Sequence, residues 1–240
     1  MSFKLDILAI GAHPDDVELG CGGTIAKEIA DGKLVGILDL TKGELGTRGT
    51  PKIRAMEAEA AAGVLGVMVR ENLGLPDGFL ENTKEYQLKI VEIIRKYQPD
   101  IVLCNAIEDR HPDHAKGSKL ASDACFLSGL RAIKTDIGFG NQEAWRPKNV
   151  YHYIQWKGIE PDFVVDISEF MDVKENAIKA FKSQFFDPNS KEPESPITSK
   201  NFFDSVDYRA RDLGRIIGVD YAEGFTSERY VAVKKLSNIF

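Results

Sequence analysis

The sequence predicts an α/β protein, a Rossmann-like sandwich in which a mostly parallel sheet is flanked by helices. Short apolar runs alternate with longer helical patterns through the first 125 residues. The apolar runs are rich in β-branched residues and contain few polar side chains, which is typical of strands buried on both faces. Parallel strands need crossover connections, so this alternation favours a parallel sheet with helices on both sides.

Each element of the first half has a local signal. The expected strands are the apolar runs Leu5–Ala12, Leu34–Leu40, Val67–Leu73 and Ile101–Cys104. The expected helices are Thr24–Ala30, Lys52–Leu65, Lys84–Tyr97 and Ala115–Leu130. Gly22 and Gly23 open the first helix, Pro51 suits the start of the second, and Pro99 follows the end of the third.

The second half is less regular. The expected strands are Val150–Trp156, Asp162–Ile167 and Tyr230–Lys234, and the expected helices are Glu169–Phe185 and Val206–Ile217. The segment Asp187–Ser199 holds three of the ten prolines and is expected to be a mobile surface loop of the kind that forms a lid. We find no internal repeat or linker, so residues 1–240 are expected to form a single domain.

Composition excludes several classes of partner. The chain carries 31 Lys and Arg against 37 Asp and Glu, a formal charge of −6, which argues against a nucleic-acid partner. No apolar stretch approaches the roughly 18 residues of a membrane span, so we expect no membrane partner. The three cysteines, Cys21, Cys104 and Cys125, form no C-x-x-C pair, which favours a reduced cytoplasmic location.

Three of the four histidines lie in two short clusters, GAHPDD at Gly11–Asp16 and EDRHPDH at Glu108–His114. Each cluster follows a predicted strand, and ligands of open parallel sheets bind beyond the carboxyl ends of the strands. The candidate metal ligands are His13, Asp16, His111 and His114. A catalytic zinc typically takes three such ligands and leaves a fourth position for water. Asp15 and Asp113 then remain as candidates for a general base.

Other interpretations of these residues are open at this stage. Aspartates in strand-end loops often form Asx-turns and helix N-caps, and Asp113, Asp15 or Asp16 suits such a role. One alternative class is a receiver-like module that binds Mg²⁺ through aspartates, but such a module does not require an H-x-D-H segment. A dinucleotide-binding domain needs G-x-G-x-x-G after the first strand, and that pattern is absent there.

Both clusters match the signatures of a known family. The chain resembles the PIG-L/LmbE-like zinc-dependent N-acetylglucosamine deacetylases, whose motifs stand here as Ala12–Asp16 (AHPDD) and His111–His114 (HPDH). Further segments are similar to the bacillithiol biosynthesis branch of this family: GTIAK, LTKGELGTRGT, the stretch from Arg54, LPDG, EDRHPDH and YAEGF. The resemblance covers nearly the whole chain.

The resemblance implies a role for each motif residue. His13, Asp16 and His114 would be the metal ligands, with zinc as the metal; a His₂Asp site also accepts Fe²⁺ or Co²⁺. Asp15 would be the general base. His111 would stabilise the oxyanion or protonate the leaving amine, and Asp113 would hold His111 in place.

The resemblance also implies the reaction and the partners. The reaction is removal of the N-acetyl group from an amino-sugar conjugate, with N-acetylglucosaminyl malate as the substrate expected for the bacillithiol branch. The alternative substrate is another N-acetyl sugar, such as N-acetylglucosamine or a chitin oligomer. The branch further implies a homo-oligomer, with a hexamer among the candidate states.

Arg54 resembles the arginine that reaches the sugar or its acidic aglycone, and Arg110 is a second candidate for binding substrate. Each has an alternative interpretation as a surface arginine in an ion pair. One departure concerns a late-loop tyrosine of some relatives, suggested as an oxyanion donor. The matching segment here is Asn201–Asp204, with two phenylalanines, so Tyr208 or His111 would have to replace it.

Overall fold

The structure, a computed structural model, describes residues 3–138 and 140–235. Its strands are β1 (Ile7–Gly11), β2 (Val35–Thr41), β3 (Val69–Leu75), β4 (Ile101–Cys104), β5 (Asn149–Tyr153), β6 (Phe163–Asp166) and β7 (Ala222–Ser227). Its α-helices are α1 (Asp16–Ala30), α2 (Pro51–Leu65), α3 (Lys84–Tyr97), α4 (Pro112–Ser128), α5 (Met171–Lys179) and α6 (Lys200–Ile217).

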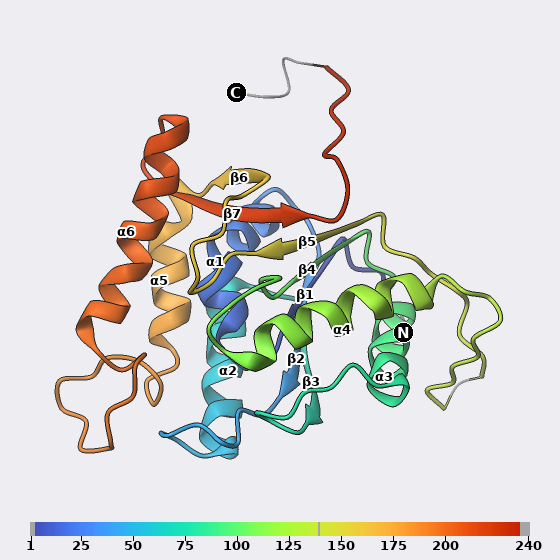
Figure 1. Cartoon of the computed structure of the whole chain (residues 1–240), viewed down its shortest axis with the longest axis horizontal. Helices are drawn as coiled ribbons and strands as arrows, with labels where there is room; N and C mark the ends of the chain where they lie inside the picture. The colour runs from blue at the N-terminus through green and yellow to red at the C-terminus, as the bar shows by residue number, and fades with distance from the viewer. Residues whose placement is uncertain (1–2, 139, 236–240) are drawn as a thin grey trace.

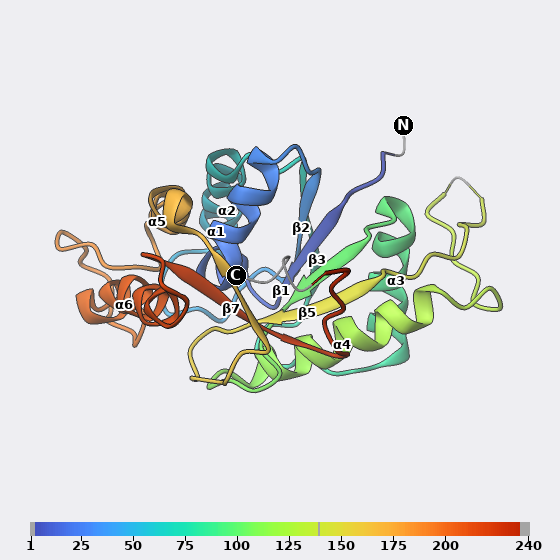
Figure 2. The ribbon, with the colours of Figure 1, turned by 90° about the horizontal axis from the view of Figure 1, so that it is seen from above.

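The strands form one seven-stranded sheet in the order β3-β2-β1-β4-β5-β7-β6 (Figure 1). The strands from β3 to β5 run parallel, whereas β7 pairs antiparallel with β5 and β6. Helices α3 and α4 cover one face, and α1, α2 and α5 cover the other (Figure 2). The predicted α/β fold with a mostly parallel, helix-flanked sheet is confirmed.

The strand order places the two histidine clusters next to each other. The chain runs outward from β1 through β2 to β3, and then returns to place β4 on the other side of β1. Ligand sites of such sheets lie at this reversal, beyond the carboxyl ends of the strands. The first cluster continues β1 and the second follows β4, so their adjacency is a consequence of topology.

Helix α1 begins eight residues earlier than the predicted start at Thr24, since it runs from Asp16. Gly20, Gly22 and Gly23 therefore lie inside a helix, although glycine is a poor helix former. The helix is kinked at Cys21, whose φ is −146°. Tertiary packing overrides propensity here, because a Cβ at Gly20 would overlap the ring of Tyr153 and one at Gly23 would lie within 3.0 Å of the Ile167 side chain.

The strand predicted at Tyr230–Lys234 is wrong, because the structure has no strand there and Tyr230 is 100% exposed. The last strand is β7, whose sequence AEGFTS has little β-propensity. Backbone pairing with β5 on one side and β6 on the other stabilises this segment as a strand. Smaller shifts affect the late helices: the predicted Glu169–Phe185 is a 3-10 turn at Ser168–Phe170 followed by α5, and α6 begins at Lys200 rather than Val206.

The contact between Gly20 and Tyr153 gives a stability prediction. Tyr153 is fully buried and donates its hydroxyl proton to the Ile10 carbonyl oxygen at 2.9 Å, so its ring has no room to move. Gly20→Ala should lower the free energy of unfolding by about 1–3 kcal/mol through overpacking. Chemical denaturation followed by circular dichroism measures this change.

Gly22→Ala is the matched control in the same helix. A Cβ there would meet Lys174 Cγ at 3.5 Å, which is ordinary contact, so this variant should stay within about 1 kcal/mol of the parent. Equal stability of the two variants would contradict the packing that we describe for α1.

Candidate metal centre and its pocket

A pocket of about 400 Å³ lies at the reversal point of the sheet. Seven of the eight predicted site residues line it: His13, Asp15, Asp16, Arg54, Arg110, His111 and His114. The eighth, Asp113, is fully buried behind the pocket wall. The predicted lid segment contributes three residues to the lining, Ser195, Pro196 and Ile197, and Arg48 Nε donates to the carbonyl oxygen of Pro193 at 2.6 Å.

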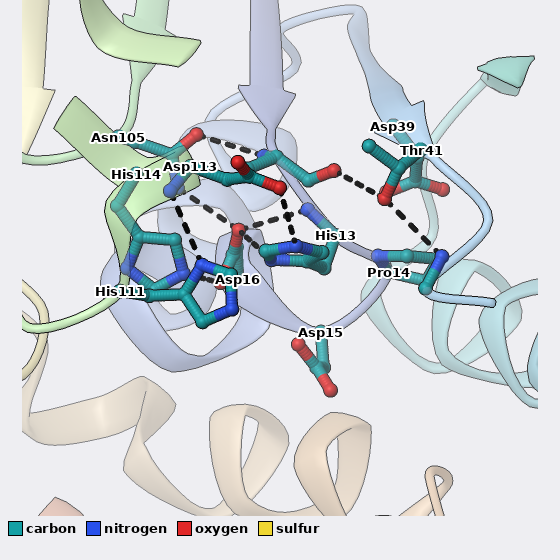
Figure 3. A network of polar contacts seen from close by, with 12 residues as sticks. His13, Pro14, Asp15, Asp16, Asp39, Thr41, Asn105, His111, Asp113 and His114 are labelled. Atoms are coloured by element: carbon teal, nitrogen blue, oxygen red, sulfur yellow. Dashed lines mark hydrogen bonds and ion pairs between the residues drawn. The ribbon is translucent and has the colours of Figure 1, made fainter. Parts of the chain in front are cut away.

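The three histidines of the two clusters converge in this pocket (Figure 3). The ring centroid of His13 lies 4.6 Å from that of His111 and 5.5 Å from that of His114, and the last two lie 5.1 Å apart. His13 follows β1, whereas His111 is the N-cap of α4 and His114 lies in its first turn. The strand order therefore brings together residues about a hundred positions apart in sequence.

Both imidazoles of the predicted ligand set face Asp16. His114 Nε2 lies 3.1 Å from Asp16 Oδ1, and His13 Nδ1 lies 3.5 Å from Asp16 Oδ2. Burial opposes ionisation of Asp16, but His114 and His13 hold the pKa of its carboxyl well below the usual range. Burial also disfavours a charged His114 ring, yet Asp16 and Asp109 together raise its pKa to about 9.

The other nitrogen of each ring contacts a second carboxylate. His13 Nε2 lies 2.9 Å from Asp77 Oδ1, and His114 Nδ1 lies 2.9 Å from Asp109 Oδ2. In metal sites a ligating histidine commonly donates a hydrogen bond from its other ring nitrogen to a carboxylate, which fixes the orientation and the tautomer of the ring. The nitrogens turned toward Asp16 have no other partner among the described residues. This donor set therefore fits a divalent metal ion.

In the described part of the chain, two sets of three side chains have ligand atoms all within 4.8 Å of one another: His13 with His111 and His114, and His13 with Asp77 and Asp113. The predicted set of His13, Asp16 and His114 is neither of these. The first set shares two members with the predicted one and takes His111 in place of Asp16. In the second, backbone amides engage both carboxylates, with Leu45 N donating to Asp77 at 2.8 Å. The contacts of the inner nitrogens favour the set that contains Asp16, because His13 Nδ1 and His114 Nε2 both face its carboxylate.

Asp15 lies beside the candidate ligands in an unusual backbone conformation. It precedes α1 with a φ of 117°, in the left-handed region that a non-glycine residue adopts only at a cost. Its carboxylate is buried, and burial raises the pKa of Asp15 to about 7, although Arg54 opposes this shift. A carboxylate with a pKa near neutrality is suited to accept and release a proton.

Arg54 lines the pocket but is buried and paired with Asp15. Its Nη2 donates to Asp15 Oδ2 at 3.0 Å and to the Pro14 carbonyl oxygen at 2.5 Å, and Nη1 donates to the Gly43 carbonyl oxygen at 3.2 Å. Among the described residues Nε has no acceptor. Both terminal nitrogens of Arg54 are therefore engaged within the protein, and its charge is paired with that of Asp15. This arrangement limits the contact with substrate that we expected for Arg54.

Asp113 does not hold the His111 ring as we expected. Its carboxylate accepts from Gly78 N at 2.7 Å and Leu80 N at 3.2 Å, and it lies 3.5 Å from His13 Nε2. The link to His111 is the Asp113 backbone amide, which donates to Nδ1 at 3.2 Å. Burial, followed by the charges of His13 and His114, lowers the pKa of His111. A neutral His111 ring then carries its proton on Nε2.

Arg110 and the late aromatic residues lie toward the outside of the pocket. The exposed Arg110 guanidinium lies 4.7 Å from the centre of the Trp156 ring. Phe202 lines the pocket and stacks on Trp156 with centroids 5.3 Å apart. Tyr208 lies in an adjoining groove, where its hydroxyl donates to the Asn201 carbonyl oxygen at 2.9 Å. Of the two proposed replacements for a late-loop tyrosine, His111 lines the pocket and Tyr208 does not.

Sequence reasoning missed two amides that hold Asp16. Asn105 Nδ2 donates to Asp16 Oδ2 and Gln155 Nε2 donates to Asp16 Oδ1, both at 2.9 Å. The same Asn105 nitrogen also donates to Gln155 Oε1 at 2.9 Å, so the amides are fixed to each other. Both side chains are buried. Each follows a strand end, β4 or β5, and this position was the only signal for them in the sequence.

Asp77 and Asp109 were also missed as partners of the histidines. Both lie in segments that carry the family resemblance, LPDG and EDRHPDH, but no local pattern pairs Asp77 with a histidine 64 positions away. Trp156 N and Lys157 N, each at 3.3 Å, donate to the carboxylate of Asp109. Each of the two aspartates therefore contacts a candidate ligand histidine and also accepts at least one hydrogen bond from a backbone amide of a neighbouring loop.

Comparison with known proteins agrees with this geometry. Residues 8–125, which contain both histidine clusters, match the family model PIG-L, described as GlcNAc-PI de-N-acetylase. The diacetylchitobiose deacetylase of Thermococcus kodakarensis is 34% identical over 189 residues, which cover 75% of this chain and 70% of that protein. The chain belongs to the PIG-L deacetylase family.

Two solved structures have the same overall fold. The conserved protein TT1542 from Thermus thermophilus is 39% identical with a TM-score of 0.86, and the alignment covers 97% of this chain and 98% of that one. The N,N'-diacetylchitobiose deacetylase from Pyrococcus horikoshii is 28% identical with a TM-score of 0.79, over 99% of this chain and 89% of that one.

The amide contacts to Asp16 give a prediction about metal affinity. Gln155→Met keeps the side-chain size but removes the donor to Asp16 Oδ1, so the dissociation constant for Zn²⁺ should rise about 10- to 100-fold. Titration of the metal-free protein against a chromophoric chelator measures this constant. Gln87→Met, on α3 and away from the pocket, is the control and should bind Zn²⁺ like the parent. Equal affinity of the two variants would show that Gln155 does not support the ligand.

Proposed function

We propose that this protein is a metal-dependent hydrolase that removes the N-acetyl group from an N-acetylglucosamine conjugate. The observation that carries this proposal is the buried carboxylate of Asp15, which lies in one pocket with a His₂Asp donor set. Hydrolysis of an amide requires an activated water, a group that takes its proton and a donor for the developing oxyanion. Membership of the PIG-L deacetylase family supports the same reaction.

In this proposal His13, Asp16 and His114 hold the metal, which is zinc; Fe²⁺ and Co²⁺ suit the same donors. When bound, a divalent metal lowers the pKa of water and polarises a carbonyl group. Asn105 and Gln155 keep the Asp16 carboxylate in one orientation, and Asp77 and Asp109 orient the two imidazole rings. These contacts reduce the motion of the ligands before substrate arrives.

The protein's own groups carry the proton transfers. Asp15 takes a proton from the water that attacks the acetyl carbonyl carbon. The Nε2–H of the neutral His111 ring donates a hydrogen bond to the developing oxyanion. The proton that Asp15 has taken from the water passes to the amine nitrogen as the carbon–nitrogen bond breaks, which returns Asp15 to its ionised form. Acetate and a free amino sugar are the products. Asp113 supports the site indirectly, because its carboxylate contacts His13 and accepts hydrogen bonds from the backbone of the Gly78–Leu80 loop.

For the substrate we propose N-acetylglucosaminyl malate, as in bacillithiol biosynthesis, on the strength of the motif similarity described above. Arginines at the pocket of an acidic protein are consistent with a carboxylate-bearing conjugate. The alternative is a neutral substrate, since two similar proteins are diacetylchitobiose deacetylases. Acetate release from the malate conjugate, N-acetylglucosamine and diacetylchitobiose by the zinc-loaded protein separates the two proposals.

Three broader expectations stay predictions: a single domain over residues 1–240, a homo-oligomer such as a hexamer, and a cytoplasmic location. The three cysteines are buried and free, in keeping with a reduced compartment. Within the described ranges, no helix has both the length and the apolar sequence needed to cross a membrane.

The role of Asp15 gives a direct test by substitution. Asp15→Asn keeps the shape of the side chain but removes the proton acceptor, so kcat for acetate release should fall about 10²- to 10⁴-fold while zinc stays bound. Metal analysis of the same sample checks the zinc content. Asp31→Asn, at the exposed end of α1, is the control and should keep parental activity. Near-parental turnover by zinc-loaded Asp15→Asn would rule out this base.

A further inference from the structure

The arginines of the pocket divide into two kinds. Arg54 is paired with Asp15, whereas no carboxylate oxygen of the described residues lies within 4.0 Å of the guanidinium of Arg48, Arg110 or Arg209. An unpaired, partly buried cation is costly unless a ligand or solvent compensates it. Arg48 is buried and Arg209 is partly buried. With the exposed Arg110 beside the same pocket, in a chain with a formal charge of −6, they require an explanation.

Arg209, which sequence reasoning did not select, is held in place by neutral groups. It comes from α6, and its Nε donates to the Ser205 carbonyl oxygen at 3.2 Å while Nη1 donates to the Gln155 carbonyl oxygen. Burial lowers the pKa of Arg209, whose guanidinium nevertheless stays charged at neutral pH. Its Nη2 donates to no atom of the described residues, so this nitrogen is free for a ligand.

Arg110 and Arg48 extend the positive region. Arg110 lies over Trp156, and Trp156 and Arg209 both line the main pocket and the groove that adjoins it. Arg48 is buried, and its Nε and Nη2 donate to the carbonyl oxygens of Pro193 and Glu192 at 2.6 and 3.2 Å. As in Arg209, one terminal nitrogen, Nη1, has no acceptor in the described part of the chain.

The acidic groups of the pocket do not neutralise these arginines. Asp15 is engaged by Arg54, and Asp16 by two histidines and two amides. Asp77 and Asp109 contact His13 and His114. Asp109 lies near enough to Arg209 to favour its charge, but the oxygens of Asp109 are taken by His114 and backbone amides. Negative charge is therefore concentrated at the metal centre, and positive charge remains free beside Trp156.

We propose that Arg209, with Arg110 and Arg48, forms a subsite for a carboxylate on the aglycone of the substrate. The planar guanidinium matches a carboxylate and donates two parallel hydrogen bonds to it. This inference rests on the proposed deacetylation, because the sugar must place its acetyl group at the metal centre while its aglycone reaches Trp156. It assigns the selectivity for acidic conjugates to α6 and the Arg110 loop rather than to Arg54.

The test compares an acidic and a neutral substrate. Zinc-loaded protein is assayed with N-acetylglucosaminyl malate and with methyl N-acetylglucosaminide, which has no carboxylate. Arg209→Gln should lower the ratio of the two kcat/KM values about tenfold or more, since a hydrogen bond between charged groups is lost. Arg110→Gln, an exposed residue whose side chain supports no backbone group, should change the ratio in the same direction. Arg215→Gln, at the exposed end of α6 and paired with Asp212, is the control and should keep the parental ratio.

A binding measurement separates this inference from the proposed function. L-Malate is titrated calorimetrically into zinc-loaded protein, and its dissociation constant should rise about tenfold in Arg209→Gln relative to the parent and the control. If neither substrate releases acetate, the proposed function fails, and the malate titration still decides the subsite. An unchanged substrate ratio together with unchanged malate binding in Arg209→Gln would overturn the subsite.

Discussion

The site depends on one carboxylate, that of Asp16, which is fixed where the sheet reverses its strand order. Its two oxygens are contacted by both candidate ligand histidines and by two buried amides, and Oδ2 also accepts from the His13 backbone amide at 2.9 Å. These partners follow β1, β4 and β5, so the carboxylate joins three neighbouring strand ends. A metal bound there would receive ligands already held in place by the fold.

The segment around Asp16 shows how the fold produces this arrangement. Strand β1 ends at Gly11 and α1 starts at Asp16, which leaves a short turn to carry His13 and Asp15. Asp15 takes the left-handed conformation, which directs its carboxylate to Arg54 and away from Asp16. The adjacent aspartates have different properties: burial raises the pKa of Asp15 although Arg54 opposes the shift, whereas His114 and His13 lower the pKa of Asp16 against the effect of burial. Such divergence is typical of a site where one carboxylate binds a cation and the other exchanges a proton.

The sequence was sufficient for the parts that depend on local patterns and motifs. The helix at Lys84–Tyr97 and the strand at Ile101–Cys104 match their predicted bounds, and both histidine clusters lie at one pocket. Contacts between distant segments could not be predicted, because nothing local in Gln155 or Arg209 indicates its neighbours. The same reason explains the missed strand β7, whose weak propensity is overridden by pairing on both sides, and the helix that begins before three glycines.

The most direct test of the account is the position of the metal. Crystals of the protein loaded with Zn²⁺ should give an anomalous diffraction peak about 2.0–2.2 Å from His13 Nδ1, an oxygen of Asp16 and His114 Nε2. His111 and Asp15 should then face the ion without coordinating it through the ring or the carboxylate. A peak coordinated by His111 in place of Asp16, or by Asp77 and Asp113 with His13, would contradict the central claim.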